Sequence, residues 1–261
     1  MFQTAVLASG SKGNCALVQT ETSALLLDAG LSGIKILTAL EQLKIDLDKI
    51  KGVLVSHEHS DHVKGAGIIA RKLGTPVFIT EATYHICRKS IDPAKHGLEF
   101  FEHDKKFSIG DIIVEAFPSS HDVVDGSNFV FYKEGCSKRK LAHATDLGFG
   151  SRIMLHRIKE STTIILESNH DEKMLWDGPY PIFLKQRVKS KHGHLSNNQA
   201  VGVISQIIHP GLKNLILAHL SEQNNLPDLA QTVMENYLKE MRYDLKLIVS
   251  SQYEPTELVD V

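Results

Sequence analysis

Short apolar segments separated by turns recur along the whole chain, and their length of about four to eight residues favours strands over buried helices. In the first half they predict strands at residues 4–8, 16–19, 23–27, 52–56 and 77–80, a strand pair within 106–117, and a hairpin of 128–133 and 140–145. In the second half they predict strands at residues 163–167, 214–218 and 245–250. Glycine-rich and polar turns, such as the Ser-Gly-Ser-Lys-Gly-Asn segment at 9–14, separate these strands.

Apolar residues at helical spacing predict helices between the strands. The expected helices follow Ser32, end at Leu73, or span residues 81–89, 196–208 and 228–241. Ser196 and Gln199 have the spacing of a capping box, which sets the start of the 196–208 helix. This mixture of strands and helices indicates the α/β class, with sheets covered by helices. Because no linker is visible, we expect residues 1–261 to form a single domain.

Composition limits the possible functions. The formal net charge of -2 excludes a generally basic nucleic-acid binder but leaves room for a local basic face. Three cysteines without a CxxC pair indicate neither a disulfide framework nor a cysteine zinc site, and they suit a reducing compartment. The N-terminus does not have the pattern of a signal peptide, and no apolar run approaches the roughly 20 residues of a membrane span. We therefore expect a cytoplasmic protein that does not enter a membrane.

Histidine placement carries the strongest chemical signal. The segment His-Glu-His-Ser-Asp-His at 57–62 follows an apolar strand and packs three imidazoles and a carboxylate into six residues. Side chains at i and i+2 of an extended loop point the same way, so His57 and His59 can bind one ion while Asp61 and His62 face another. Nitrogen and carboxylate ligands without thiolates suit zinc, manganese or iron. The alternative is a solvated polar loop with unconnected histidines.

Several other candidate ligands also follow predicted strands. His121, Asp146 and His219 each stand just after one, as His57 does. Strand ends converge at one edge of a sheet, where α/β proteins usually build their sites. Each of these residues alone is compatible with an ordinary turn or surface position, but their joint placement predicts one metal centre.

The 57–62 segment resembles the HxHxDH signature of the metallo-β-lactamase superfamily. The remaining residues of that superfamily's pattern follow in order as His121 in Pro-Ser-Ser-His-Asp, Asp146 in Ala-Thr-Asp-Leu-Gly and His219 in Leu-Ala-His-Leu-Ser. The resemblance implies a four-layer αββα sandwich that holds two divalent ions. It assigns one ion to His57, His59 and His121, the other to Asp61, His62 and His219, and gives both ions a contact with Asp146. Asp28, in Leu-Asp-Ala-Gly, matches a carboxylate that orients a ligand imidazole.

Further segments resemble the bacterial YycJ/WalJ family over nearly the whole chain. They are Ser-Gly-Ser-Lys-Gly-Asn at 9–14, Glu-Ser-Asn-His-Asp at 167–171, Gly-Pro-Tyr-Pro at 178–181, Gly-His-Leu-Ser-Asn at 193–197 and His-Leu-Ser-Glu-Gln-Asn-Asn at 219–225. This resemblance implies a DNA exonuclease that acts from 5′ to 3′ and is linked to DNA repair.

A basic stretch gives an independent indication of a nucleic-acid substrate. Four cations recur at period two within residues 184–191: Lys185, Arg187, Lys189 and Lys191. In an extended strand they would share one face and could neutralise successive phosphates, with Arg187 the best single phosphate ligand. The alternative is an edge strand protected by lysines against aggregation. No aromatic platform for base stacking is evident in the sequence.

The expected mechanism is metal-assisted hydrolysis. The two ions, bound by Asp61 and Asp146 among others, would lower the pKa of a shared water, and the resulting hydroxide would attack phosphorus in line. His194 is the first candidate to protonate the leaving oxygen or to bind the phosphate, next to the helix start at Ser196, and His170 is the second. Either histidine could instead be structural.

Two other functions stay open at this point. One is a small-molecule hydrolase of the same fold, such as a lactonase, a thioesterase or a cyclic phosphodiesterase. The other is a non-catalytic regulatory protein, which the complete ligand set disfavours. A β-CASP nuclease is disfavoured because only roughly 70 residues separate Asp146 from His219, which leaves little room for an inserted domain. The sequence leaves the oligomeric state open.

Overall fold

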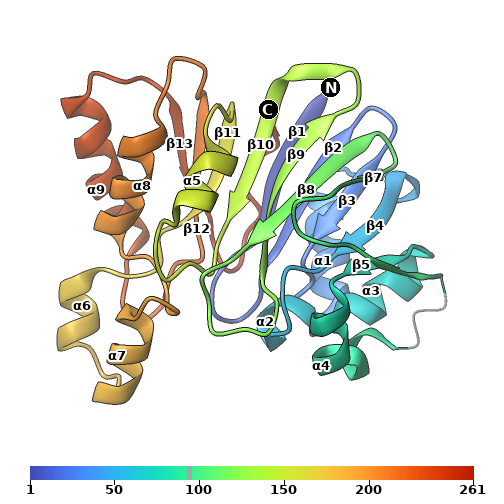
Figure 1. Ribbon diagram of the computed structural model, residues 1–261, viewed down its shortest axis with the longest axis horizontal. Coiled ribbons are helices and arrows are strands. Elements are labelled where there is room, and N and C mark those ends of the chain that lie inside the picture. Colours follow the sequence, from blue (N-terminus) through green and yellow to red (C-terminus); the bar gives the residue numbers. More distant parts are fainter. Residues whose placement is uncertain (93–95) are drawn as a thin grey trace.

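The computed structural model describes residues 1–92 and 96–261, which form two mixed sheets packed face to face (Figure 1). The first sheet has the order β14 (Val259–Asp260), β1 (Phe2–Ala8), β2 (Cys15–Thr20), β3 (Ala24–Leu27), β4 (Ile50–Leu54), β5 (Val77–Ile79) and β6 (Leu98–Phe100). Strands β1 to β3 and β14 pair in antiparallel fashion, whereas β3 to β6 run parallel. The carboxyl ends of β3 and β4 therefore meet at one edge.

The second sheet repeats this arrangement. Its order is β13 (Lys246–Val249), β12 (Asn214–Ala218), β11 (Thr163–Glu167), β10 (Cys136–Ala144), β9 (Ser127–Lys133), β8 (Ile112–Pro118) and β7 (Lys106–Ile109). Strands β10 to β13 are parallel, and β8 runs in the same direction because β9 is antiparallel to both β8 and β10. Hence β8, β10, β11 and β12 all end at the same edge of the sheet.

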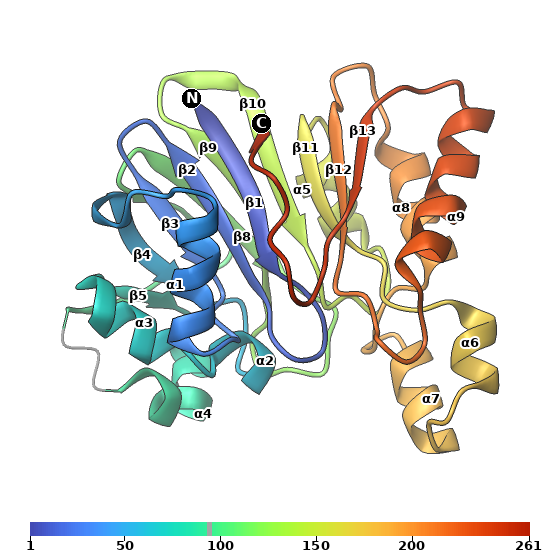
Figure 2. The ribbon, with the colours of Figure 1, turned by 180° about the vertical axis from the view of Figure 1, so that it is seen from behind.

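Helices cover the outer face of each sheet, as the front and back views show (Figures 1 and 2). On the first sheet they are α1 (Gly33–Gln42), α2 (Ser60–Val63), α3 (Ala66–Leu73) and α4 (Glu81–Ile91), with a 3₁₀ turn η1 at Leu47–Lys49. On the second they are α5 (Arg152–Ile158), α8 (Asn197–Ile207) and α9 (Pro227–Glu240). Helices α6 (Glu172–Asp177) and α7 (Ile182–Lys189) project away from both sheets.

Three apolar layers hold the four layers of structure together. In β3, Leu25 and Leu27 pack between the sheets, whereas Leu26 packs against the helices of the first sheet. In β11, Ile165 faces the other sheet and Leu166 faces α8 and α9. Strands buried on both faces lose the usual polar alternation, which explains why these segments are continuously apolar. The four-layer αββα sandwich expected from the sequence is confirmed.

The local signals act largely as expected. The capping box of Ser196 and Gln199 forms at the start of α8, and Gly74 ends α3 in the left-handed conformation. Ser151 and Asp171 are N-caps of α5 and α6, two helices that the apolar pattern did not predict. None of the helices within the described ranges is both long and apolar enough to cross a membrane.

The sequence-based prediction for the basic stretch at residues 184–191 is wrong. The basic stretch is not an extended strand, because residues 182–189 form α7, with Pro181 as its N-cap. In a helix, Lys185 and Lys189 share a face at i and i+4, while Arg187 lies on a different face. The cations that a strand would have aligned are thus divided between two sides of α7.

Candidate metal centre

The seven predicted ligands converge at the edge where the parallel strands end. His57 follows β4, His121 follows β8, Asp146 follows β10 and His219 follows β12. The loop after β4 turns into the short helix α2, which carries Asp61 and His62. The two sheets thus contribute ligands from opposite sides of the sandwich, although the residues are up to 162 positions apart in the chain.

The ligand atoms form overlapping groups within 4.8 Å of one another. Three of the groups are His57, His59 and His121; His57, His62 and Asp146; and Asp61, His62 and His219. A fourth combines Asp146 and His219 with Glu167 and His194. Asp146 lies between the groups, with Oδ2 at 3.5 Å from His62 Nε2 and Oδ1 at 3.3 Å from His219 Nε2 and 3.8 Å from His121 Nε2. The arrangement has a histidine cluster on one side, a mixed cluster on the other and a carboxylate between them.

Backbone geometry at the strand ends directs these side chains. Asp28, Asp146 and His219 each adopt the left-handed region, with φ of 59°, 57° and 57°. Such a conformation is uncommon for residues other than glycine, costs of order 1–3 kcal/mol and concentrates at functional sites. Here it turns the chain sharply at the end of a strand. The turn directs Asp146 and His219 into the cluster and brings Asp28 to the His62 ring.

Hydrogen bonds from outside the cluster orient the rings. Asp28 Oδ2 lies 2.8 Å from His62 Nδ1 and accepts a hydrogen bond from Ser56 Oγ, while its Oδ1 accepts one from the Ser56 backbone. His121 Nδ1 lies 3.0 Å from the Gly193 carbonyl oxygen. In both rings these contacts occupy Nδ1 and leave Nε2 to face the cluster, which is how proteins usually position metal-binding imidazoles.

The imidazoles and carboxylates of the cluster shift one another's pKa values. Burial alone would lower the pKa of His62, but the carboxylates of Asp146 and Asp28 outweigh it and hold that pKa well above its ordinary value. Burial also disfavours the charged form of Asp146, yet the imidazoles of His219 and His62 keep its pKa well below the usual range. Burial and the neighbouring His62 depress the pKa of His57. The carboxylates therefore favour positive charge inside the cluster, and either bound cations or protons can supply that charge.

A direct test of fit comes from polar atoms without partners. Nε2 of His57, Nε2 of His219 and Oδ2 of Asp146 are buried and have no hydrogen-bond partner. Buried polar groups are rarely left unpaired, because each costs about 1–3 kcal/mol. All three atoms belong to the ligand groups, and the donor set of imidazole and carboxylate suits divalent cations. The residues present fit a metal centre.

Glu167 completes the site, although the sequence analysis gave it no role. It ends β11 and is fully buried, with Oε2 accepting hydrogen bonds from the backbone of Leu147 and Leu195 and Oε1 lying 2.6 Å from His194 Nδ1. His194 stacks on the His219 ring with centroids 5.1 Å apart. Glu167 stands at a strand end like the predicted ligands, and that position is the signal that could have identified it.

An open cleft of about 280 Å³ lies over the cluster. Its walls include Tyr180, Arg187 and His194. The Arg187 guanidinium is paired with Asp122, with Nε at 2.6 Å and Nη2 at 2.5 Å from the same carboxylate oxygen. Arg187 is thus the predicted phosphate ligand that lines the cleft, and Asp122 holds its guanidinium there.

The structure places the other predicted residues away from the cleft. Lys185, Lys189 and His170 line a second groove on the other side of α7. Ser196 is buried, and its hydroxyl caps α8 and donates a hydrogen bond to Glu172. Its position explains the start of α8 but does not bring it to the metal cluster.

Comparison with known proteins agrees with this geometry. A family described as "Beta-lactamase superfamily domain" matches residues 24–219. The chain is 40% identical over 237 residues to the exodeoxyribonuclease YycJ of Bacillus anthracis, which covers 90% of this chain and 88% of the relative. It is 34% identical over 269 residues to the exodeoxyribonuclease WalJ of Streptococcus pneumoniae serotype 2, which covers 100% of this chain and 98% of the relative.

A solved structure shows the same fold at low identity. The metallo-β-lactamase fold protein YhfI of Bacillus subtilis superimposes with a TM-score of 0.72 at 15% identity, covering 98% of this chain and 100% of that one. The fold, the candidate ligands at the strand ends and the sequence similarity along nearly the whole chain thus indicate the same family. The chain belongs to the β-lactamase superfamily and, within it, to the family of YycJ and WalJ.

Proposed function

We propose that this protein is a metal-dependent exonuclease that hydrolyses phosphodiester bonds of DNA. The observation that carries the proposal is the convergence of seven imidazoles and carboxylates, three of them with unpartnered buried atoms, beneath an open cleft. The two similar exodeoxyribonucleases support DNA as the substrate. We further propose that residues 1–261 work as one hydrolase domain in the cytoplasm, with 5′ to 3′ polarity and a role in DNA repair.

The proposed metal content is two divalent ions, either zinc, manganese or iron. The first would be held by His57, His59 and His121, and the second by Asp61, His62 and His219, with Asp146 shared. Ions held in this way would lower the pKa of a coordinated water and neutralise charge on the phosphate. Asp28 orients His62, and through it the second group of ligands.

His194 is the best candidate to protonate the leaving oxygen. The hydrogen bond of Nδ1 with the buried carboxylate of Glu167 holds the ring in place and leaves Nε2 for the substrate. The ring lines the cleft and stacks on His219, so Nε2 lies next to the metal ligands. Glu167 is a positioning residue, because its own oxygens are fully engaged with His194 and two backbone amides. His170 lies in the second groove, and we no longer assign it this role.

Arg187 is proposed to bind a substrate phosphate in the cleft. Its planar guanidinium can hold two phosphate oxygens at once, a geometry that lysine lacks. In the present arrangement Asp122 occupies that fork. A phosphate that enters the cleft would compete with Asp122 for the guanidinium, and Arg187 would then contact the substrate without a change of fold.

A direct test is digestion of end-labelled duplex DNA by protein purified without oxygen and analysed for bound metals. With manganese, zinc or iron supplied, we expect products to be released in order from the 5′ end. A panel of lactones, thioesters and cyclic phosphodiesters tests the small-molecule alternative in parallel. DNA that stays intact with all three metals, together with rapid turnover of one of these small substrates, would overturn the proposal.

A further inference from the structure

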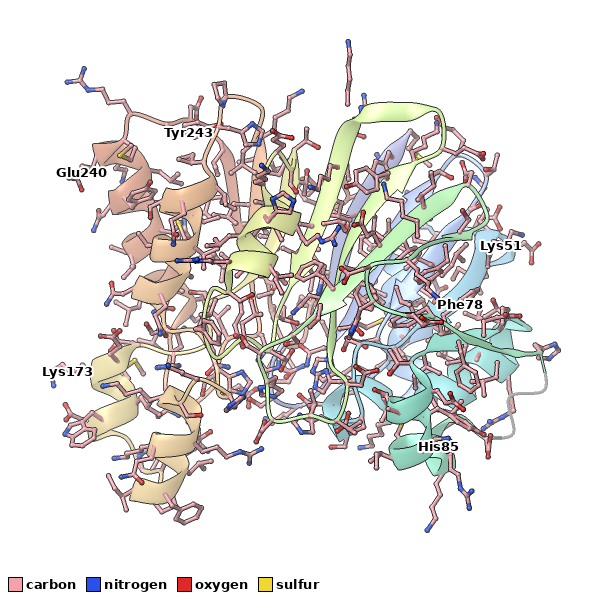
Figure 3. The ribbon with its side chains drawn as sticks, in the orientation of Figure 1. Lys51, Phe78, His85, Lys173, Glu240 and Tyr243 are labelled. Carbon is pink, nitrogen blue, oxygen red and sulfur yellow. The ribbon has the colours of Figure 1, made fainter. Side chains whose placement is uncertain are left out.

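Helices α6 and α7 form an arm on the segment between β11 and α8, and both views show it extending beyond the sandwich (Figures 1 and 2). No side chain of α7 is buried. The arm instead exposes large apolar side chains, with Trp176 exposed to 63% and Phe183 to 69%. Lys173 on α6 points outward from this end of the molecule (Figure 3). Exposed apolar side chains that stand beside a groove make this end of the molecule a candidate binding surface.

A groove of about 380 Å³ lies between the two helices of this arm. Trp176 and Leu175 of α6 form its apolar part, and Lys185 and Lys189 of α7 form its cationic part. His170 also lines it; its side chain is only 1% exposed, and Nδ1 has no hydrogen-bond partner. The groove therefore combines an exposed indole, ammonium groups and a buried imidazole with an unused nitrogen.

The charge of the groove favours an anionic ligand. Among the described residues it is lined by three lysines, Lys173, Lys185 and Lys189, and by one carboxylate, that of Glu172. Lys173 is paired with Asp177 and Lys185 donates to the Trp176 carbonyl, but no described carboxylate pairs with Lys189. This local excess of positive charge stands out in a chain of net charge -2.

The groove and the metal cleft lie on opposite sides of α7. Leu184, Arg187 and Val188 lie on the cleft side of that helix, whereas Lys185 and Lys189 lie on the groove side. A helix with its side chains is about 10–12 Å across. This width corresponds to roughly three nucleotides at about 3.4 Å each along a stacked strand.

We propose that the arm binds a second part of the DNA strand, about three nucleotides away from the bond that is hydrolysed. This inference rests on the proposed function. A base stacks on Trp176, and the flanking phosphates contact Lys185 and Lys189. The structure thus supplies a stacking platform that the sequence analysis did not find. Stacking reads no particular sequence, because every base has an aromatic face.

The chain contains a single tryptophan, so fluorescence excited selectively at tryptophan reports on Trp176 alone. The metal-loaded enzyme is titrated with single-stranded oligonucleotides whose phosphorothioate linkages resist cleavage. We expect a 12-mer to quench the fluorescence and a dinucleotide, which fills only the cleft, to leave it unchanged. Equal quenching by both, or quenching by neither, would overturn the proposal.

Steady-state kinetics of variants provide the second measurement. Trp176→Ala should raise KM for long DNA roughly tenfold, because the base loses its stacking partner, while Trp176→Phe should restore KM. Lys185→Ala combined with Lys189→Ala should lower the slope of log affinity against log salt by about 2. Hydrolysis of a chromogenic p-nitrophenyl ester of thymidine monophosphate should be unchanged in all of them. Phe100→Ala, an exposed aromatic in β6 of the other sheet, is the matched control.

The outcomes separate this proposal from the proposed function. If the arm variants hydrolyse DNA normally with an unchanged KM, the proposed DNA-binding role of the arm is wrong, whereas the proposed exonuclease activity stands. Quenching by the 12-mer without hydrolysis of any DNA supports the arm as a DNA site and overturns the exonuclease. A change of oligomeric state in Trp176→Ala, with DNA affinity unaltered, would show that the arm binds a second protein chain and would overturn the proposal.

Discussion

Replacement of Glu167 by glutamine is the sharpest test of how the site handles the leaving group. The carboxylate is fully buried, and its oxygens serve three donors: Leu147 N at 2.8 Å, Leu195 N at 3.1 Å and His194 Nδ1 at 2.6 Å. An amide has only one acceptor oxygen. If the NH₂ group faces the two backbone N–H groups, both of them lose their acceptor. If it faces His194, Nδ1 must accept a hydrogen bond, and the ring proton of a neutral His194 then lies on Nε2.

The size of the effect follows from these contacts. At least one hydrogen bond to a charged group is lost, which should lower the free energy of unfolding by about 1.5–3 kcal/mol. If His194 protonates the leaving oxygen, kcat on DNA should fall by roughly 10²–10⁴, the usual contribution of general acid catalysis. A p-nitrophenyl leaving group needs no proton, so turnover of the p-nitrophenyl ester should fall by less than about tenfold.

The assay compares kcat for the two substrates, with metal content measured on the same preparations. Glu235→Gln, which changes a surface carboxylate of α9, is the matched control and should leave both rates unchanged. An equal loss on both substrates with the full metal content would refute the assignment of His194 as the proton source. Metal loss in the variant would instead place Glu167 among the groups that support the metal centre.

Three further predictions concern the supports of the site. Asp28→Asn should weaken metal binding by about 10–100-fold, because the amide holds His62 Nδ1 less firmly; unchanged metal content after dialysis against a chelator would contradict this. Arg187→Lys should raise KM for DNA with little effect on kcat, because a lysine cannot hold a phosphate bidentately; a lower kcat at constant KM would argue that Arg187 acts in the chemical step. Gly30→Ala should prevent correct formation of the metal centre, since a Cβ there would lie 1.6 Å from the Asp61 carbonyl oxygen. Metal content and circular dichroism check this last prediction, with Gly202→Ala, where a Cβ meets no atom within 4 Å, as control.

Much of the fold could be predicted from the chain, because strands buried on both faces produce uninterrupted apolar segments such as 24–27 and 163–167. The candidate ligands could be predicted because His57, His121, Asp146 and His219 follow such strands, which end at a common edge, and because the remaining three lie within five residues of His57. The helix at 182–189 could not. Cations at period two favour an extended reading, but the segment has no sheet partner and its helix is stabilised by neither a buried face nor a side-chain cap.

The role of Glu167 illustrates a different limit. A glutamate at the end of a buried strand is compatible with simple exposure at the sheet edge, and only the packing of Leu147 and Leu195 around it shows that it is enclosed. Periodicity reports which face of a strand is buried, but it does not report which loops close over the end of that strand. Contacts between distant loops, which the three-dimensional structure reveals, decide the role of such a residue.

The turns that follow β3, β10 and β12 contain strained residues, and the surrounding structure holds them in place. Asp28, Asp146 and His219 hold left-handed backbone conformations within two residues of the ends of β3, β10 and β12, whose side chains are buried in the apolar layers. A rigid strand fixes the start of each turn. At His219, hydrogen bonds fix the far side: Asn169 Nδ2 donates to the His219 carbonyl oxygen, and the His219 backbone N–H donates to the Ser9 hydroxyl oxygen. The energy of the sandwich thereby offsets about 1–3 kcal/mol at each turn. Because these strands and hydrogen bonds hold the candidate ligands in place, a cation that binds there would not need to order them, and such alignment favours metal affinity.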